Sequence, residues 1–196
     1  GSVQVRSGQA VASGEVLGLV GMSGQAEFPH VHLTVRFNNV AVDPFVGPAP
    51  IAACGAARTP LWSAAAQAKL GYVRSGLLNA GFAAAAPESP AILLGQYQDP
   101  ALPRDAANLV FWVEAFGVNT GDRSRLTVTA PNGRAIANQT TEPSTQHWAS
   151  RMVYTGLRRT TPQWEAGVYK GVYVLERMIN GAWTTVFTVE RQVELR

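Results

Sequence analysis

The longest alternating segment of the chain, residues 167–195, constrains the fold most. It reads "GVYKGVYVLERMINGAWTTVFTVERQVEL", with an Asn180-Gly181 pair between two runs of alternating apolar and polar residues. Asn-Gly between such runs is typical of a two-residue type I′ turn. The turn sets the register, and the expected cross-strand pairs are Trp183 with Met178 and Phe187 with Val174. The segment therefore predicts an antiparallel hairpin inside a larger sheet.

Further strand patterns precede this hairpin in the stretch from residue 73 onward. "NLVFWVEAFG" carries large residues at both parities, which is expected of a central strand between two layers, and "RLTVTA" alternates strictly with Leu126, Val128 and Ala130 inward. About seven strands with turn signals between them predict an immunoglobulin-like β-sandwich over residues 73–196. The stretch has no cysteine, so this sandwich lacks the disulfide of antibody domains.

A different composition separates this region from the first 48 residues. Residues 49–72 are rich in alanine and proline, and we expect them to be a linker with one short helix within residues 61–73. Cys54 is the only cysteine, so no internal disulfide forms. The chain opens with Gly-Ser, a common remnant of tag removal, which suggests that it starts inside a longer protein where Cys54 has a partner.

The overall composition excludes two classes of partner. Of the 16 basic residues, 14 are arginines spread along the chain without a cluster, and the net charge is only +3. Nucleic-acid binding usually shows as a basic patch, so we expect no nucleic-acid partner. No apolar run approaches the ~18 residues of a membrane span, so we expect no membrane span either.

Residues 1–48 repeat a short phrase in which valines alternate with glycines, as in "VRSGQAVASGEVLGLVGMSG". This pattern predicts short strands joined by glycine turns. Two kinds of domain have such strands: a lipoyl or biotinyl carrier, and the β-groove of a metallopeptidase. A carrier needs a lysine at a hairpin tip to hold its cofactor, and residues 1–48 contain none, which excludes the carrier.

Two of the three histidines, His30 and His32, stand in "PHVHLTV" at the end of this phrase. On a strand, residues i and i+2 share a face, so both imidazoles would point into one groove while Val31 and Leu33 pack on the other side. Imidazole nitrogen is a good zinc ligand. Alternatively, the two rings only satisfy hydrogen bonds on an exposed strand. We interpret the third histidine, His147, as a surface residue.

The context of these histidines resembles the C-terminal half of the lysostaphin/LytM-type zinc metallopeptidase domain, a peptidoglycan endopeptidase. The matching elements over residues 3–46 are Ser23-Gly24, Pro29, His30-Val31-His32, Asn38-Asn39 and Val42-Asp43-Pro44. The resemblance implies that His32 is a zinc ligand and that His30 lies beside the metal-bound water as general base or transition-state stabiliser. It also implies a peptidoglycan peptide as substrate and a periplasmic or extracellular location.

The fold class that follows is all-β: a partial β-groove in residues 1–48, then the immunoglobulin-like sandwich. The family's other zinc ligands lie in a His-x-x-x-Asp motif that is absent, because Thr34, Arg36 and Arg151 follow the histidines at that spacing. We therefore expect these 196 residues alone to be inactive, with zinc absent or weakly bound. Half a groove also leaves unpaired strand edges, which favour self-association through residues 3–46.

Two readings of the missing ligands stay open. Either they precede this chain in a longer protein, or the groove is degenerate and the protein is a non-catalytic interaction module that binds a peptide or a partner protein. A His-x-x-x-Asp motif in the upstream coding sequence favours the first reading, and its absence favours the second. In a third, weaker reading, the sandwich is the whole functional unit and residues 3–46 are a remnant.

Overall fold

The computed structural model describes residues 2–26, 29–48, 58–71 and 73–196. The chain divides into two compact units, Gly1–Tyr72 and Val73–Arg196. Cys54 lies outside the described residues, so the expectation of a disulfide partner stays a prediction. Within the described ranges, no helix has both the length and the apolar character needed to cross a bilayer.

Among the described residues of the first unit, regular structure is limited to one hairpin and one helix. Strand β1 (Val35–Phe37) pairs antiparallel with β2 (Val40–Val42). Asn38 and Asn39 form the turn with φ of 47° and 64°, the positive values that a two-residue type I′ turn requires. Helix α1 (Ala64–Lys69) begins at Ser63, whose hydroxyl oxygen accepts from the Ala66 N–H at 3.2 Å. Both elements confirm the sequence expectation.

The short strands predicted for the glycine-rich phrase do not form in the described residues 2–26. The glycine turns do form, since Gly8 and Gly14 have φ of 82° and 85°. Gln4 N–H donates to the Leu17 carbonyl at 2.9 Å, which brings two of the predicted strand segments together. A strand requires a continuous ladder of such bonds, and this isolated bond does not make one.

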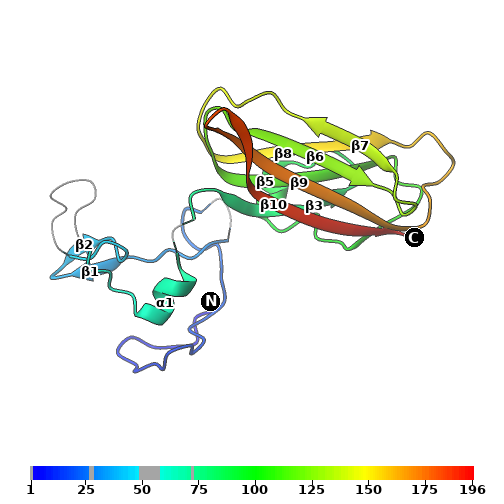
Figure 1. The fold of residues 1–196 in the computed structure, drawn as a ribbon. Coiled ribbons are helices and arrows are strands. Elements are labelled where there is room, and N and C mark those ends of the chain that lie inside the picture. The colour runs from blue at the N-terminus through cyan, green and yellow to red at the C-terminus, as the bar shows by residue number, and fades with distance from the viewer. Residues whose placement is uncertain (1, 27–28, 49–57, 72) are drawn as a thin grey trace. The chain divides into compact units, whose positions relative to one another are not determined.

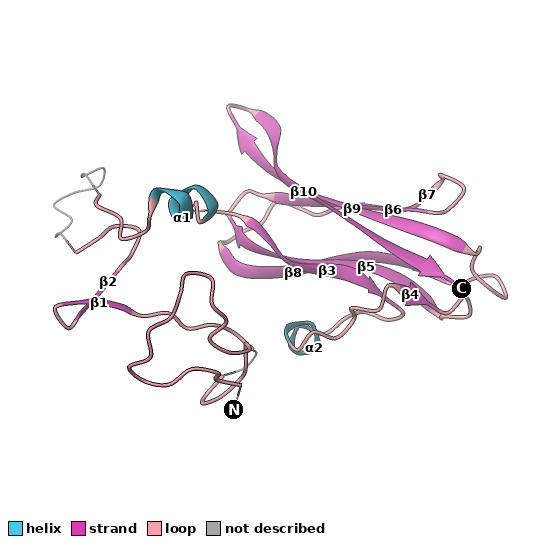
Figure 2. Cartoon of the chain, turned by 90° about the horizontal axis from the view of Figure 1, so that it is seen from below, coloured by secondary structure: helices cyan, strands magenta, loops and turns pink. Residues whose placement is uncertain are grey.

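The second unit is a sandwich of two sheets, which Figure 2 shows as two layers. The three-stranded sheet has the order β3-β5-β8, and the five-stranded sheet has the order β4-β10-β9-β6-β7. Figure 1 labels most of these strands. Their bounds are β3 Gly76–Ala83, β4 Ala101–Leu102, β5 Asn108–Val118, β6 Arg123–Thr129, β7 Ala135–Thr140, β8 Trp148–Arg158, β9 Gly167–Ile179 and β10 Ala182–Leu195. The predicted all-β class is confirmed.

The core lies between these two sheets. β5 contributes Phe111 and β9 contributes Tyr173, both fully buried. The predicted inward residues of β6 are buried as well, with Leu126 0% and Val128 1% exposed. Burial of side chains of this size stabilises the fold by about 1.5–3 kcal/mol each. The alternation read from the sequence therefore located the core face of β6.

The outer face of β5 is covered too, which explains why large residues point to both faces of this strand. Trp112 is fully buried beneath helix α2 (Ser89–Leu93) and the loop after it. Ile92 packs against Trp112, and the Tyr97 ring meets it edge-on with centroids 6.3 Å apart. Sequence analysis did not predict α2, because a helix of five residues is too short to show a helical period.

The hairpin of β9 and β10 forms about Asn180-Gly181 as predicted, with Trp183 opposite Met178. The second predicted pair is wrong: Phe187 lies opposite Leu175 instead of Val174. A β-bulge between Thr185 and Phe187 adds one residue to β10 and shifts the register beyond it. The bulge keeps the Phe187 ring against Tyr173, with centroids 5.6 Å apart.

Candidate functional site

The two histidines predicted as site residues, His30 and His32, are exposed and precede β1. The structure assigns no strand to residues 29–34, so the prediction that both histidines lie on a strand is wrong. The backbone N–H of His30 does donate to the Gly21 carbonyl at 3.3 Å, which places the His-x-His segment beside the end of the glycine-rich phrase. This single backbone bond does not make a strand ladder.

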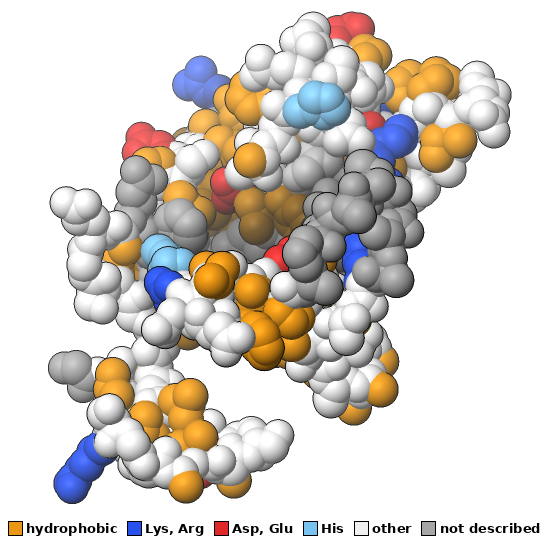
Figure 3. Space-filling model, turned by 90° about the vertical axis from the view of Figure 1, so that its left-hand side faces the viewer, with side chains coloured by type: hydrophobic (Ala, Val, Ile, Leu, Met, Phe, Trp, Pro, Cys, Tyr) orange, Lys and Arg blue, Asp and Glu red, His pale blue; other side chains and the backbone are white. Residues whose placement is uncertain are grey.

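The apolar residues around the histidines are also exposed. Val31 is 74% and Leu33 62% exposed, so their predicted packing on the side opposite the groove is wrong. In the described part of the first unit no large apolar side chain is buried, so this unit has no buried apolar core for them to join. Figure 3 shows hydrophobic side chains open at the surface on this face of the molecule.

The fit of the described residues to a zinc ion can be tested on the donor set. A catalytic zinc site takes about three protein ligands. No group of three or more His, Cys, Asp or Glu side chains among the described residues could hold a metal ion. Asp43 forms a turn instead, because its carboxylate accepts from the Phe45 N–H at 2.8 Å. The described residues therefore do not fit a complete zinc site, and we derive no catalytic step through one.

Two buried acidic residues of the sandwich, Asp122 and Glu176, form ion pairs. Asp122 is fully buried and accepts two hydrogen bonds from Arg177, at 2.7 and 2.8 Å. These bonds raise the pKa of the Arg177 guanidinium above its usual value, against the opposing effect of burial. Glu176 pairs with Arg123 at 2.8 Å and with Arg125 at 3.2 Å. Each carboxylate thus has a partner that explains its position without catalysis.

Of the other polar side chains of the sandwich, Glu114 is buried and His147 is exposed. Glu114 is 5% exposed and accepts from the Ser150 hydroxyl at 2.7 Å. His147 is exposed in the loop before β8, as predicted.

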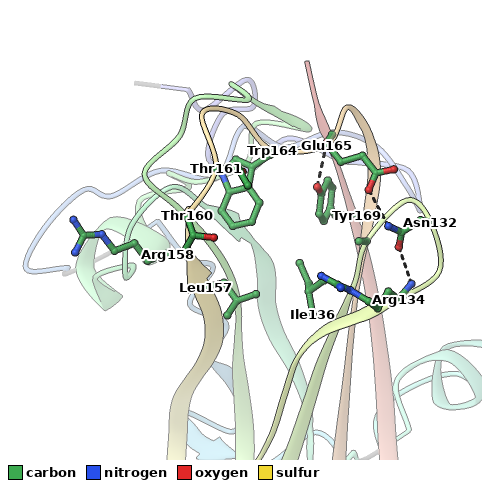
Figure 4. Close-up of a pocket in the computed structure, with 11 residues that line it drawn as sticks. Asn132, Arg134, Ile136, Leu157, Arg158, Thr160, Thr161, Trp164, Glu165 and Tyr169 are labelled. Carbon is green, nitrogen blue, oxygen red and sulfur yellow. Dashed lines mark hydrogen bonds between the residues drawn. The ribbon is translucent and has the colours of Figure 1, made fainter.

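A cavity of about 270 Å³ opens at one end of the sandwich (Figure 4). It lies between the β6–β7 turn, the end of β8 and the β8–β9 loop, and sequence analysis did not find it. Its residues come from segments distant in sequence, so no local motif marks them. Eleven residues line it: Ala130, Asn132, Arg134, Ile136, Leu157, Arg158, Thr160, Thr161, Trp164, Glu165 and Tyr169.

Comparison with known proteins gives one family match. Residues 1–44 match the model of peptidase family M23. The match supports an M23-family peptidase segment at the start of the chain, which agrees with the resemblance found from the His-x-His motif. No curated protein matches the chain.

Comparison with solved structures gives weak likenesses. A β-glucuronidase of Parabacteroides merdae has 9% identity and a TM-score of 0.37, with 63% of this chain and 14% of that chain covered. The C-terminal domain of wzt has 11% identity and a TM-score of 0.41, with 64% and 74% covered. A CARDB domain of Pyrococcus furiosus in complex with di-metal ions has 9% identity and a TM-score of 0.33, with 50% and 81% covered. The chain thus spans about one seventh of the β-glucuronidase.

Proposed function

We propose that residues 1–48 are the C-terminal half of a lysostaphin/LytM-type zinc endopeptidase domain that acts on peptidoglycan peptides outside the cytoplasm. The observation that carries the proposal is the M23 match over residues 1–44, which includes His30 and His32. The hairpin at Asn38-Asn39 lies where the motif requires it. In this proposal residues 49–72 are a linker, and residues 73–196 are an immunoglobulin-like sandwich.

The proposed roles follow the motif: His32 is a zinc ligand and His30 is the catalytic residue beside the metal. Because the described residues hold no complete donor set, the remaining ligands must come from outside them. The 196 residues alone are therefore inactive in this proposal. The exposed position of both histidines is consistent with a groove whose other wall is supplied by additional chain.

The test is a hydrolysis assay on purified peptidoglycan with added zinc. We expect no release of soluble fragments by the 196-residue chain. If a longer protein carries the upstream ligands, we expect zinc-dependent release by that protein. In that longer protein, His32→Ala should abolish release and His147→Ala should not, since His147 lies in an exposed loop of the sandwich. Turnover by the 196 residues alone would refute the proposed inactivity.

The second candidate is a non-catalytic interaction module with a degenerate groove. The large exposed apolar surface of the first unit favours it, since such surfaces often mark contacts with other proteins. An inactive longer protein that lacks a His-x-x-x-Asp motif would support this module and contradict the hydrolase.

We also propose that the chain self-associates through residues 3–46. Large apolar side chains are exposed throughout this segment, including Val3 at 75%, Leu19 at 70% and Val40 at 64%. The β1–β2 sheet has two strands, so within the described residues each strand leaves its outer edge unpaired. An unpaired edge next to exposed apolar side chains is a template for another chain.

A further inference from the structure

One wall of the cavity at the end of the sandwich is aromatic and is held by several hydrogen bonds. Trp164 donates through its indole Nε1 to the Ala106 carbonyl at 2.9 Å, and its backbone N–H donates to the Arg104 carbonyl at 2.9 Å. The Arg104 guanidinium returns a bond from Nε to the Trp164 carbonyl at 2.9 Å. The Tyr169 ring meets Trp164 edge-on, with centroids 6.4 Å apart. The aromatic wall is therefore formed before any ligand arrives.

The opposite wall is the β6–β7 turn, which is fixed by its own side chains. The side-chain oxygen of Asn132 accepts from the backbone N–H of Arg134 at 3.0 Å. The side-chain amide nitrogen of Asn132 donates to the Glu165 carboxylate at 3.0 Å. Figure 4 shows Glu165 turned toward Asn132. Glu165, the only carboxylate among the residues lining the cavity, is thus hydrogen-bonded to Asn132.

The residues lining the cavity include two arginines, Arg134 and Arg158, and one carboxylate, Glu165. Arg134 forms no ion pair in the described part of the chain, and Figure 4 shows its side chain running from the turn toward Ile136. The guanidinium of Arg158, the other arginine of the cavity, points away from it in the same view. Arg134 therefore offers its donors beside an apolar floor formed by Ile136 and Leu157.

This combination defines the chemistry of a ligand. A planar guanidinium binds a carboxylate through two parallel hydrogen bonds, and these are stronger than bonds between neutral groups. The apolar floor and Trp164 suit a small hydrophobic group attached next to that carboxylate. At about 270 Å³, the cavity lies at the small end of ligand pockets and holds one or two residues of a peptide.

We propose that this cavity binds the free C-terminal carboxylate of a peptide ending in a small apolar residue, with Arg134 as the carboxylate-binding side chain. The α-carboxylate pairs with the guanidinium of Arg134, and the terminal side chain lies against Leu157 and Trp164. The proposal depends only on the sandwich. It stands whether or not the first unit belongs to an active peptidase.

The test is a titration of the 196-residue chain with N-acetyl-Ala-Ala and with its C-terminal amide, followed by amide-resolved NMR. We expect saturable shifts at Gly133 and at the Trp164 indole with the acid, and affinity lower by about tenfold or more with the amide, because a charge-assisted pair is lost. Arg134→Gln should lower affinity for the acid by a similar factor. Arg74→Gln, at an exposed arginine of the sandwich that does not line the cavity, is the matched control and should change the affinity less than about twofold.

Three outcomes would overturn the proposal. Equal affinity for acid and amide would show that the carboxylate is not recognised. Preference for glucuronic acid over the peptide acid would make the cavity a saccharide site. No shift up to about 10 mM of the peptide acid would exclude useful binding. Arg134 is exposed, so Arg134→Gln should keep the thermal unfolding midpoint of the parent chain, and loss of binding then reports on recognition.

Discussion

A Cβ atom placed on Gly171 would lie 2.5 Å from the ring of Phe111. Gly171 is in β9 and Phe111 is in β5, so this contact joins the two sheets of the sandwich at the centre of its core. Real Cβ atoms do not approach a ring carbon so closely, because the van der Waals radii overlap. The sheets keep their spacing at this point because residue 171 has no side chain.

We predict that Gly171→Ala destabilises the sandwich by about 1–3 kcal/mol through overpacking. The check is the free energy of unfolding in urea, followed by near-UV circular dichroism. Phe111→Leu should be destabilising on its own, but the double variant should be more stable than the sum of the two losses predicts. Additive losses would show that Phe111 is not what the new methyl group meets.

Asp122 and Arg177 connect the start of β6 to β9, and Arg177 also donates to the Ser75 hydroxyl at 3.2 Å. We predict that Asp122→Asn costs about 2–4 kcal/mol, since it leaves a partly buried guanidinium without its counter-ion. Glu190→Gln is the matched control: the Lys170–Glu190 pair is also 2.7 Å long but its side chains are 41% and 57% exposed. It should cost under about 1 kcal/mol. Equal losses in the free energy of unfolding for the two variants would mean that burial does not determine how much these ion pairs stabilise the fold.

The sandwich could be predicted from sequence because its signals are local and repeated. Alternation located Leu126 and Val128 in the core, and Asn180-Gly181 located the hairpin. The bulge near Phe187 could not be predicted, because nothing in "TTVFT" distinguishes a regular strand from one with an extra residue. With the shifted register, Phe187 of β10 packs on Tyr173 of β9.

The candidate sites show the same division between local and non-local signals. His30 and His32 were found because their motif is contiguous, but their strand was predicted wrongly, since a strand depends on partners that the described residues do not supply. The cavity at Arg134 was missed for the opposite reason. Its residues gather from the β6–β7 turn and the β8–β9 loop, and neither segment reads as a binding motif.

Tyr173 makes the stability of the sandwich sensitive to alkaline pH. Burial raises the pKa of its hydroxyl, which lies 3.1 Å from the Ser124 hydroxyl. An unfolded tyrosine ionises near pH 10, so the stabilisation is complete below that pH and is lost as the pH rises toward the higher folded-state pKa. Between these two pKa values, we predict that the free energy of unfolding falls by about 1.4 kcal/mol per pH unit for each such tyrosine.

The check is urea unfolding from about pH 8 to about pH 11. Tyr173→Phe removes the hydrogen bond, so its free energy of unfolding near neutral pH should be lower by about 1 kcal/mol. Above about pH 10, its free energy of unfolding should fall less steeply than that of the parent chain. Part of the decline should remain, because burial also raises the pKa of Tyr169. An unchanged alkaline slope in Tyr173→Phe would assign the decline to other groups.

Self-association through residues 3–46 should be visible by sedimentation velocity as a weight-average mass that rises with protein concentration. Leu19 and Val31 are among the most exposed large side chains of the segment, at 70% and 74%. The double variant Leu19→Glu/Val31→Glu should move the equilibrium to the monomer, because burying carboxylates in an apolar contact is costly. The control Leu78→Glu/Val168→Glu changes residues of the sandwich that are 51% and 49% exposed and should leave the mass unchanged. A parent chain that stays monomeric at every concentration, or an equal effect of both double variants, would contradict association through this segment.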